Sequence, residues 1–276
     1  MYKKTAENMV LREKNDEYRP ELFRLTRLKR RKCCGKMTAK KKRGNEAMKI
    51  HGLQKMTLLD FPGKVACTVF LGGCDLRCPF CHNSELLDMG ADAVMDDAEL
   101  LKFLQKRVGL LDGVAFTGGE PTLRSDLGTL LEKVRALGYA IKLDTNGNHP
   151  AALKKLVEAG LVDYVAMDVK NGPTRYAETV GLAQFDMTAV RESIAFLLSD
   201  AVDYEFRTTV VQELHDEASF EEIGKLICGA KRYYLQKFTD RDSVAFAGLH
   251  APSDDALAHY AEIVEPYVVS AELRGV

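Results

Sequence analysis

Short apolar runs alternate with helix-like spacings of hydrophobic residues from Met48 to the end of the chain. Residues 127, 130, 131, 134 and 137 are apolar, the spacing of one helix face, and Gly138 can end that helix. Short runs rich in β-branched and aromatic residues predict strands. The predicted strands are 64–71, 113–117, 139–144, 162–168, 203–211 and 233–238, and the predicted helices are 97–108, 127–137, 150–159, 188–199, 217–228 and 253–264.

Six strands that are each followed by a helix predict an α/β fold with a parallel sheet and right-handed crossovers. A complete barrel of eight such units takes roughly 250 residues, whereas only 229 of the 276 residues follow position 47. We therefore expect an open, partial (β/α)6 barrel. A doubly wound sheet is the alternative.

The charge distribution divides the chain in two. Residues 1–47 carry 16 Lys and Arg against 6 Asp and Glu, a net charge of +10, while the remainder carries 23 against 34, a net charge of -11. The first segment has too few apolar residues to offset its ordering entropy, so we expect a basic, disordered extension over 1–47 and one domain over 48–276. A basic arm can bind nucleic acid or an acidic partner. We favour a plain solvated extension and expect no nucleic-acid partner.

The remaining composition excludes several classes of protein. A hydrophobic content of 46% and a charged content of 29% are ordinary for a globular protein and exclude a wholly disordered chain. No stretch approaches the roughly 18 apolar residues of a membrane span, and the basic N-terminus lacks the apolar run of a signal peptide. We therefore expect a cytoplasmic protein without a membrane partner.

Three of the seven cysteines fall within eight residues, directly after the first predicted strand. Cys74, Cys78 and Cys81 have the spacing C-x3-C-x2-C, and three thiolates on one tight loop can hold three irons of a [4Fe–4S] cluster. The fourth iron would remain open to a substrate. Zinc is the alternative, with His82 as its fourth ligand. We expect Cys67 and Cys228 to be core residues, because a free buried cysteine behaves as a small hydrophobe.

Polar residues follow the next predicted strands. Gly118 and Gly119 allow a close backbone approach, and the carboxylate of Glu120 can accept a ligand ammonium. Asp144 and Thr145 end the third strand, and Asp168 and Lys170 end the fourth. Arg207 lies inside the apolar fifth strand, where an unpaired charge is costly. We expect it to face an anion in the barrel mouth or to pair with an acid such as Asp168.

Taken together, these motifs resemble the radical S-adenosylmethionine (radical SAM) superfamily. The three cysteines, with Phe80 before the last, match its cluster motif, and residues 118–121 match the element for the amino group of S-adenosylmethionine. The resemblance runs from about Met48 to the C-terminus. It implies a partial (β/α)6 barrel, one [4Fe–4S] cluster and S-adenosylmethionine as cofactors.

Within the superfamily, the chain is similar to activating enzymes of glycyl-radical enzymes. This resemblance is carried by residues 53–55, 59–64, 81–83, 144–147 and 167–170. Among these enzymes, 52–55 and 58–64 are most similar to activating proteins of anaerobic ribonucleoside-triphosphate reductase. The pyruvate formate-lyase-type activase is a close relative and an alternative. In that relative, the matching acids lie near a monovalent cation.

The resemblance implies that Asp144, Thr145, Asp168 and Lys170 lie around S-adenosylmethionine, with Arg207 as a further contact. The relative also has a histidine near the end of the sixth strand, for which Gln236 is the candidate replacement here. Only 36 residues, none of them Cys, separate Cys81 from Gly118, so we expect one cluster and no ferredoxin-like insert.

The implied reaction is a one-electron cleavage of S-adenosylmethionine to methionine and a 5′-deoxyadenosyl radical, which removes a hydrogen from a glycine of the partner. The implied partners are a glycyl-radical enzyme, with anaerobic ribonucleotide reductase favoured, and an electron donor of the flavodoxin or ferredoxin type. Two other classes stay open: a small-molecule radical SAM enzyme such as 7-carboxy-7-deazaguanine synthase, and a non-enzymatic zinc module.

Overall fold

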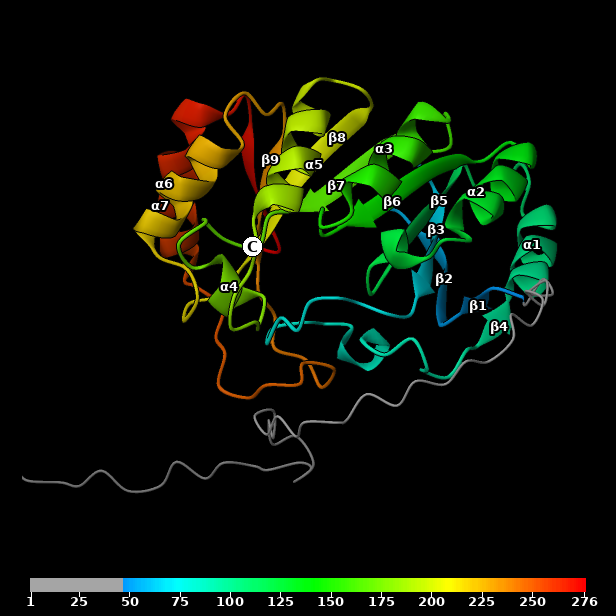
Figure 1. The fold of residues 1–276 in the computed structure, drawn as a ribbon, viewed down its shortest axis with the longest axis horizontal. Coiled ribbons are helices and arrows are strands. Elements are labelled where there is room, and N and C mark those ends of the chain that lie inside the picture. Colours follow the sequence, from blue (N-terminus) through cyan, green and yellow to red (C-terminus); the bar gives the residue numbers. More distant parts are fainter. Residues whose placement is uncertain (1–46) are drawn as a thin grey trace, which may run out of the picture. The chain divides into compact units, whose positions relative to one another are not determined.

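The structure, a computed structural model, describes residues 47–276 (Figure 1). The predicted basic extension over 1–47 lies outside these residues, apart from its last position. Within the described part, no helix combines the length and the apolar character that crossing a membrane requires.

The sheet is built from the strands that the apolar runs predicted. They are β3 (Ala66–Leu71), β5 (Gly113–Gly118), β6 (Ala140–Thr145), β7 (Tyr164–Asp168), β8 (Asp203–Val210) and β9 (Tyr233–Lys237). The predicted helices form as α1 (Asp97–Gln105), α2 (Leu127–Ala136), α3 (Pro150–Glu158), α5 (Thr188–Leu198), α6 (Glu217–Leu226) and α7 (Asp254–Val264). Neighbouring strands of this set pair in parallel and in chain order. The α/β fold is confirmed.

Two edge strands extend this sheet beyond the prediction. β2 (Gly52–Thr57) pairs antiparallel with β3, and β10 (Ala271–Arg274) pairs parallel with β9. The full order is β10-β9-β8-β7-β6-β5-β3-β2. Because β2 and β10 do not pair with each other, the sheet stays open and does not close into a barrel, as the sequence predicted.

Short elements complete the described chain. β1 (Lys49–Ile50) pairs antiparallel with β4 (Met95–Asp96) in a separate two-stranded sheet. The remaining helical turns are α4 (Tyr176–Thr179) and the 3-10 helices η1 (Ser84–Leu86), η2 (Pro121–Leu123) and η3 (Glu265–Tyr267). Local sequence fixes several helix starts: Asp96 and Glu99 form a reciprocal capping box before α1, and Asp216 caps α6 in the same way.

Two apolar clusters pack against the sheet, one on each face. The inner face is the one that the main helices do not cover. The helices lie along one face of the sheet (Figure 1), and the main core fills the space between that face and their apolar sides. On the other face, Phe61, Ala66, Tyr164 and Ala166 form a small cluster near the amino ends of the strands. The carboxyl ends of the strands are therefore free to carry polar side chains on that inner face.

Candidate active site

A single pocket lies at the carboxyl ends of the parallel strands and collects nearly all of the predicted site residues. Strand ends that lie far apart in the sequence meet here because parallel strands present their carboxyl ends at one edge of the sheet. The predicted residues that line it are Cys74, Cys78, Phe80, Cys81, Gly118, Gly119, Asp144, Thr145, Asp168, Lys170 and Arg207. Gln236, the candidate replacement for a histidine, lines it as well.

The three cysteines sit on the loop after β3, which we call the cysteine loop (residues 72–82). Backbone contacts fix its course: Arg77 N donates to Val180 O at 2.9 Å, and Cys81 N donates to Cys78 O at 3.1 Å. The Arg77 guanidinium donates to the carbonyl oxygen of Cys74 at 2.7 Å. Burial raises the pKa of the Cys74 thiol to about 11 and that of Cys78 to about 12. A bound metal would have to displace these protons, because the thiolate is the metal ligand.

The donor set fits an iron–sulfur cluster better than a single zinc ion. Within residues 47–276, no three His, Cys, Asp or Glu side chains converge on one ion position. His82, the fourth ligand that zinc would need, stacks on Phe238 with ring centroids 5.5 Å apart, and its Nε2 lies 2.7 Å from Thr239 O. Three thiols on one loop can each bind a different iron of a cluster.

Gly118, the last residue of β5, and Gly119, which follows it, are needed for close packing against the end of β3 and the cysteine loop. A Cβ on Gly119 would lie 2.1 Å from Gly73 O, and a Cβ on Gly118 would lie 2.3 Å from Leu71 O. Gly118 also has a φ of +121°, which side chains rarely adopt. The double glycine therefore lets two segments of the site's own backbone pack together, which adds to the predicted close approach of a ligand.

Glu120 does not line the pocket, and this differs from the expectation that its carboxylate meets a ligand ammonium. Its side chain is 1% exposed and accepts hydrogen bonds from Thr145 Oγ1 at 2.8 Å, Asn146 N at 2.6 Å, and Thr122. Burial raises the pKa of Glu120, while these donors act in the opposite direction. The carboxylate instead joins the turn after β5 to the end of β6.

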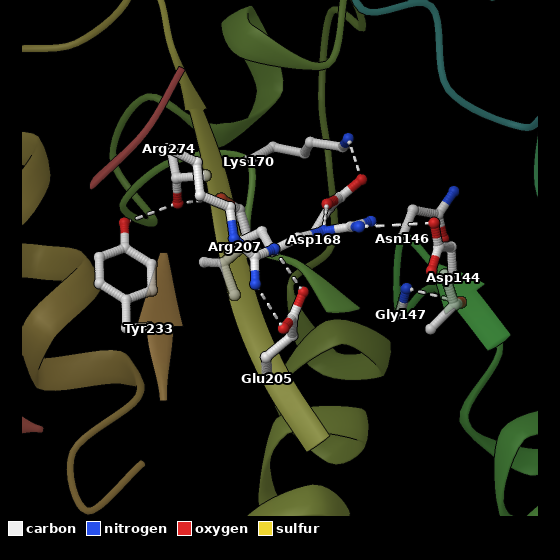
Figure 2. A network of polar contacts seen from close by, with 12 residues as sticks. Asp144, Asn146, Gly147, Asp168, Lys170, Glu205, Arg207, Tyr233 and Arg274 are labelled. Carbon is white, nitrogen blue, oxygen red and sulfur yellow. Dashed lines mark hydrogen bonds and ion pairs between the residues drawn. The ribbon is translucent and has the colours of Figure 1, made fainter. Parts of the chain in front are cut away.

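An ion-pair network joins several of the residues that line the pocket (Figure 2). Arg207 Nε donates to Asp168 Oδ1 at 2.9 Å, and Arg207 Nη1 lies 3.4 Å from Asp144 Oδ2. Lys170 Nζ donates to the second oxygen of Asp168 at 2.9 Å. The prediction that Arg207 pairs with Asp168 is confirmed, and Asp144 is a second partner.

The network holds its groups in their charged forms. Burial opposes ionisation of Asp144 and Asp168, yet the Arg207 guanidinium lowers the pKa of both carboxyls. Burial likewise opposes the charge on Lys170, and Asp168 nonetheless raises the pKa of that ammonium. The pocket therefore presents fixed charges of both signs at neutral pH, which suits a zwitterionic ligand.

Other charged residues of the inner face were not predicted. Lys142, 2% exposed, pairs with Asp144, and Glu205, 1% exposed, accepts from Arg274 Nη1 at 2.7 Å and from Arg274 Nη2 at 2.9 Å (Figure 2). Lys142 and Glu205 interrupt apolar strands as Arg207 does, and that signal could have identified them. Arg274 lies on an unpredicted strand.

Outside the pocket, the two remaining described cysteines differ. Cys67 is fully buried in β3, as predicted. Cys228 is exposed just beyond α6, so the prediction that it is a core residue is wrong. The helix α6 ends at Leu226, and the following turn directs position 228 to solvent.

Comparison with known proteins gives one family and several relatives. The family model of the Radical SAM superfamily matches residues 68–216, more than half of the chain. A protein of Methanocaldococcus jannaschii, named for a proposed glycyl-radical-enzyme-activating role, is 28% identical over 239 residues, which cover 82% of this chain and 96% of that protein. The pyruvate formate-lyase-activating enzyme of Clostridium pasteurianum is 32% identical over 128 residues, 45% of this chain and 52% of that enzyme.

A third relative and one solved structure extend the comparison. The 7-carboxy-7-deazaguanine synthase of Koribacter versatilis is 33% identical over 141 residues, 50% of this chain and 58% of that enzyme. The structure of SuiB from Streptococcus suis bound to S-adenosylmethionine has a TM-score of 0.58 at 13% identity, covering 75% of this chain and 52% of that one. This last likeness concerns the fold.

The matched region begins inside β3 and ends after β8, and it contains the cysteine loop together with the ends of β5, β6 and β7. The matching superfamily consists of enzymes that use a [4Fe–4S] cluster and S-adenosylmethionine, which confirms the predicted cofactors. By its sequence and its fold, the chain belongs to the radical SAM superfamily.

Proposed function

We propose that this protein is a radical SAM activating enzyme that generates a glycyl radical on a partner, and that the partner is anaerobic ribonucleoside-triphosphate reductase. The similarity to the M. jannaschii protein over nearly its whole length carries the activase proposal. The choice of partner rests on the resemblance of residues 52–55 and 58–64 to reductase activating proteins.

The residues of the cysteine loop take the first role. We propose that Cys74, Cys78 and Cys81 hold the [4Fe–4S] cluster, since all three line the pocket. When bound, the cluster supplies the electron that cleaves S-adenosylmethionine, and the resulting 5′-deoxyadenosyl radical takes a hydrogen from the partner's glycine. Phe80 packs against Val211, Leu214 and Phe238, which keeps the loop against the ends of β8 and β9.

The strand ends take the second role, which is to hold and orient S-adenosylmethionine. That ligand carries an ammonium, a carboxylate and a sulfonium, so a site with paired charges suits it. Lys170 supports carboxylate binding because its ammonium lines the pocket, while Asp144 and Thr145 offer oxygen acceptors. Gly118 and Gly119 contribute backbone groups to the wall beside the cysteine loop.

We further propose a cytoplasmic, anaerobic setting and an electron donor of the flavodoxin or ferredoxin type. An iron–sulfur cluster beside an open pocket is sensitive to oxygen, and the sheet leaves one side open between β2 and β10. A glycine-bearing loop of the partner could enter there.

The decisive experiment is anaerobic reconstitution with iron and sulfide, followed by S-adenosylmethionine, a strong reductant and the candidate reductase. We expect 5′-deoxyadenosine by mass spectrometry and a glycyl-radical signal on the reductase by electron paramagnetic resonance. The Cys78→Ala variant should lose both, whereas Cys228→Ala, which changes an exposed cysteine, should keep both.

The possible results separate the candidates. Cleavage with a glycyl radical on pyruvate formate-lyase, and none on the reductase, would replace the proposed partner. Cleavage of S-adenosylmethionine without a glycyl radical on either partner, together with turnover of a deazaguanine precursor, would favour the synthase, to which half of the chain is similar. Wild-type cleavage by the Cys78→Ala variant would refute the cluster assignment.

A further inference from the structure

Asp75 stands out because its carboxylate joins two loops that are distant in the sequence. It lies between Cys74 and Leu76 on the cysteine loop, and its side chain is 23% exposed. Oδ1 accepts from Asn146 Nδ2 at 2.9 Å, and Oδ2 accepts from Asn148 Nδ2 at 2.5 Å. His149 Nε2 lies 3.1 Å from the same Oδ2. Three side chains of one loop therefore converge on one carboxylate.

We propose that Asp75 is a positioning residue that fixes the cysteine loop to the loop after β6 (residues 146–149), and so sets the places of Cys74 and Asn146 in the pocket. This inference rests on the proposed role of Cys74 as a cluster ligand. Asp75 does not line the pocket, so it acts through its neighbours.

Asp75 is linked to two residues that line the pocket, one on each of the loops that it joins. Cys74, its chain neighbour, and Asn146, its hydrogen-bond partner, both line the pocket. Asn146 is held from the other side by Glu120, which accepts from its backbone N–H at 2.6 Å. Glu120 thus anchors the loop after β6 to the turn after β5. Among the side-chain hydrogen bonds of residues 47–276, those of Asp75 are the ones that join this loop to the cysteine loop.

The chemistry of the three partners explains why a carboxylate is needed. Asn146 and Asn148 both present N–H donors, and an ionised carboxylate is an acceptor at both oxygens. An asparagine at position 75 has nearly the same shape, but its NH2 group would face a donor. Asp75→Asn therefore removes the negative charge and one of the two acceptor oxygens with little change in volume.

The chain offers a matched control. Asp163 also accepts three hydrogen bonds, from Arg135 Nη1 at 2.8 Å, Arg135 Nη2 at 2.9 Å and Ile141 N at 2.7 Å. It precedes β7, so it lies at the opposite ends of the strands from the pocket. Asp163→Asn should cost comparable stability without touching the cysteine loop.

The first test measures amide hydrogen exchange in the full-length protein without iron, which makes it independent of the cluster assignment. Loss of charge-assisted bonds should speed exchange about tenfold over 72–78 and 146–149 in Asp75→Asn, with β8 unchanged. Asp163→Asn should leave both segments at the wild-type rate. Unchanged exchange in Asp75→Asn, or equal acceleration in Asp163→Asn, would overturn the proposal.

A charge exchange provides the rescue. In Asp75→Asn/Asn148→Asp, a carboxylate at 148 can accept from an amide at 75, so protection of both segments should return toward the wild-type value. A double variant as mobile as the single one would also overturn the proposal. After reconstitution, Asp75→Asn should raise the KM for S-adenosylmethionine by a larger factor than it lowers kcat, because the residue shapes the pocket wall; an equal or larger fall in kcat contradicts this.

Discussion

At the scale of single residues, Arg207 contacts more carboxylates than any other member of the network. It comes from β8 and contacts carboxylates from β6 and β7, so one side chain joins three strands. All three side chains are less than a third exposed. Removing it leaves two partly buried carboxylates, each with only a lysine as its remaining counter-charge.

We expect Arg207→Met to lower the free energy of unfolding of the iron-free protein by up to about 3 kcal/mol, the lower end of the cost of breaking a buried ion pair, because a lysine still pairs with each carboxylate. Urea denaturation measures it. Lys225→Met, which breaks the exposed pair with Glu221 on α6, should cost only about 0.3–0.5 kcal/mol. Equal losses in the two variants would mean that the network contributes no more than a surface pair.

His149 gives a pH-dependent prediction. The hydrogen bond to Asp75 raises the pKa of His149 above its unfolded value of 6.5, although burial acts against this. The charged imidazole thus favours the folded state below pH 6.5, and this contribution disappears as the pH rises through the folded pKa. The loss of stability in His149→Gln should therefore be larger near pH 5 than at about pH 9.

Urea denaturation of iron-free protein at both pH values tests this. In an Asp75→Asn background, the same His149 substitution should lose most of its pH dependence, because the carboxylate that raises the pKa is gone. If His149→Gln instead lost more stability at the higher pH, the prediction that the charged imidazole stabilises the folded state would be wrong.

At the scale of elements, the turn after β5 and the cysteine loop behave as one unit, because a Cβ on Gly119 would strike the backbone oxygen of Gly73. Gly119→Ala should destabilise the protein by about 1–3 kcal/mol through overpacking. It should also lower the affinity for S-adenosylmethionine, since the cysteine loop must move. Thermal unfolding and ligand titration measure the two effects.

Gly128→Ala is the matched control within α2. Its added Cβ would meet Leu156 at an ordinary 3.6 Å, and alanine favours a helix over glycine by up to about 1 kcal/mol. This variant should be as stable as the wild type or slightly more stable. A Gly119→Ala protein with unchanged stability would show that the loops can separate at no cost.

The elements also show what the sequence could reveal. The six central strands are largely buried and read mostly as apolar runs, so their positions were predictable. β2 has exposed Lys55 and Met56, and β10 has four residues with two charges, so neither edge strand carries such a signal. The sequence predicted that Arg207 can pair with an acid such as Asp168, and its contact with Asp144 was not predicted. The bonds of Asp75 span more than 70 residues between loops, and no local pattern encodes them.

At the scale of the whole molecule, the core does not depend on the proposed metal site. The main cluster fills the space between sheet and helices, and only Cys74 and Cys78 of the cysteine loop's thiols pack against its edge. The fold should therefore persist without iron, unlike small zinc domains that unfold when the metal is removed.

Removal of iron with a chelator should accordingly leave the far-ultraviolet circular dichroism spectrum unchanged and speed hydrogen exchange over residues 72–89. A loss of most helical signal on chelation would contradict the view that the α/β core is self-sufficient. Re-addition of iron and sulfide under anaerobic conditions should restore protection of the same residues.

The order in which the strands contribute to the pocket also has a consequence for biosynthesis. The three cysteines leave the ribosome first, and Arg207 and Gln236, which complete the pocket, follow more than 125 residues later. At about 5–20 residues per second, the three thiols wait on the order of ten seconds before their surroundings exist. During this interval they are open to oxidants, so a short exposure to air during translation should damage this protein more than the same exposure after folding.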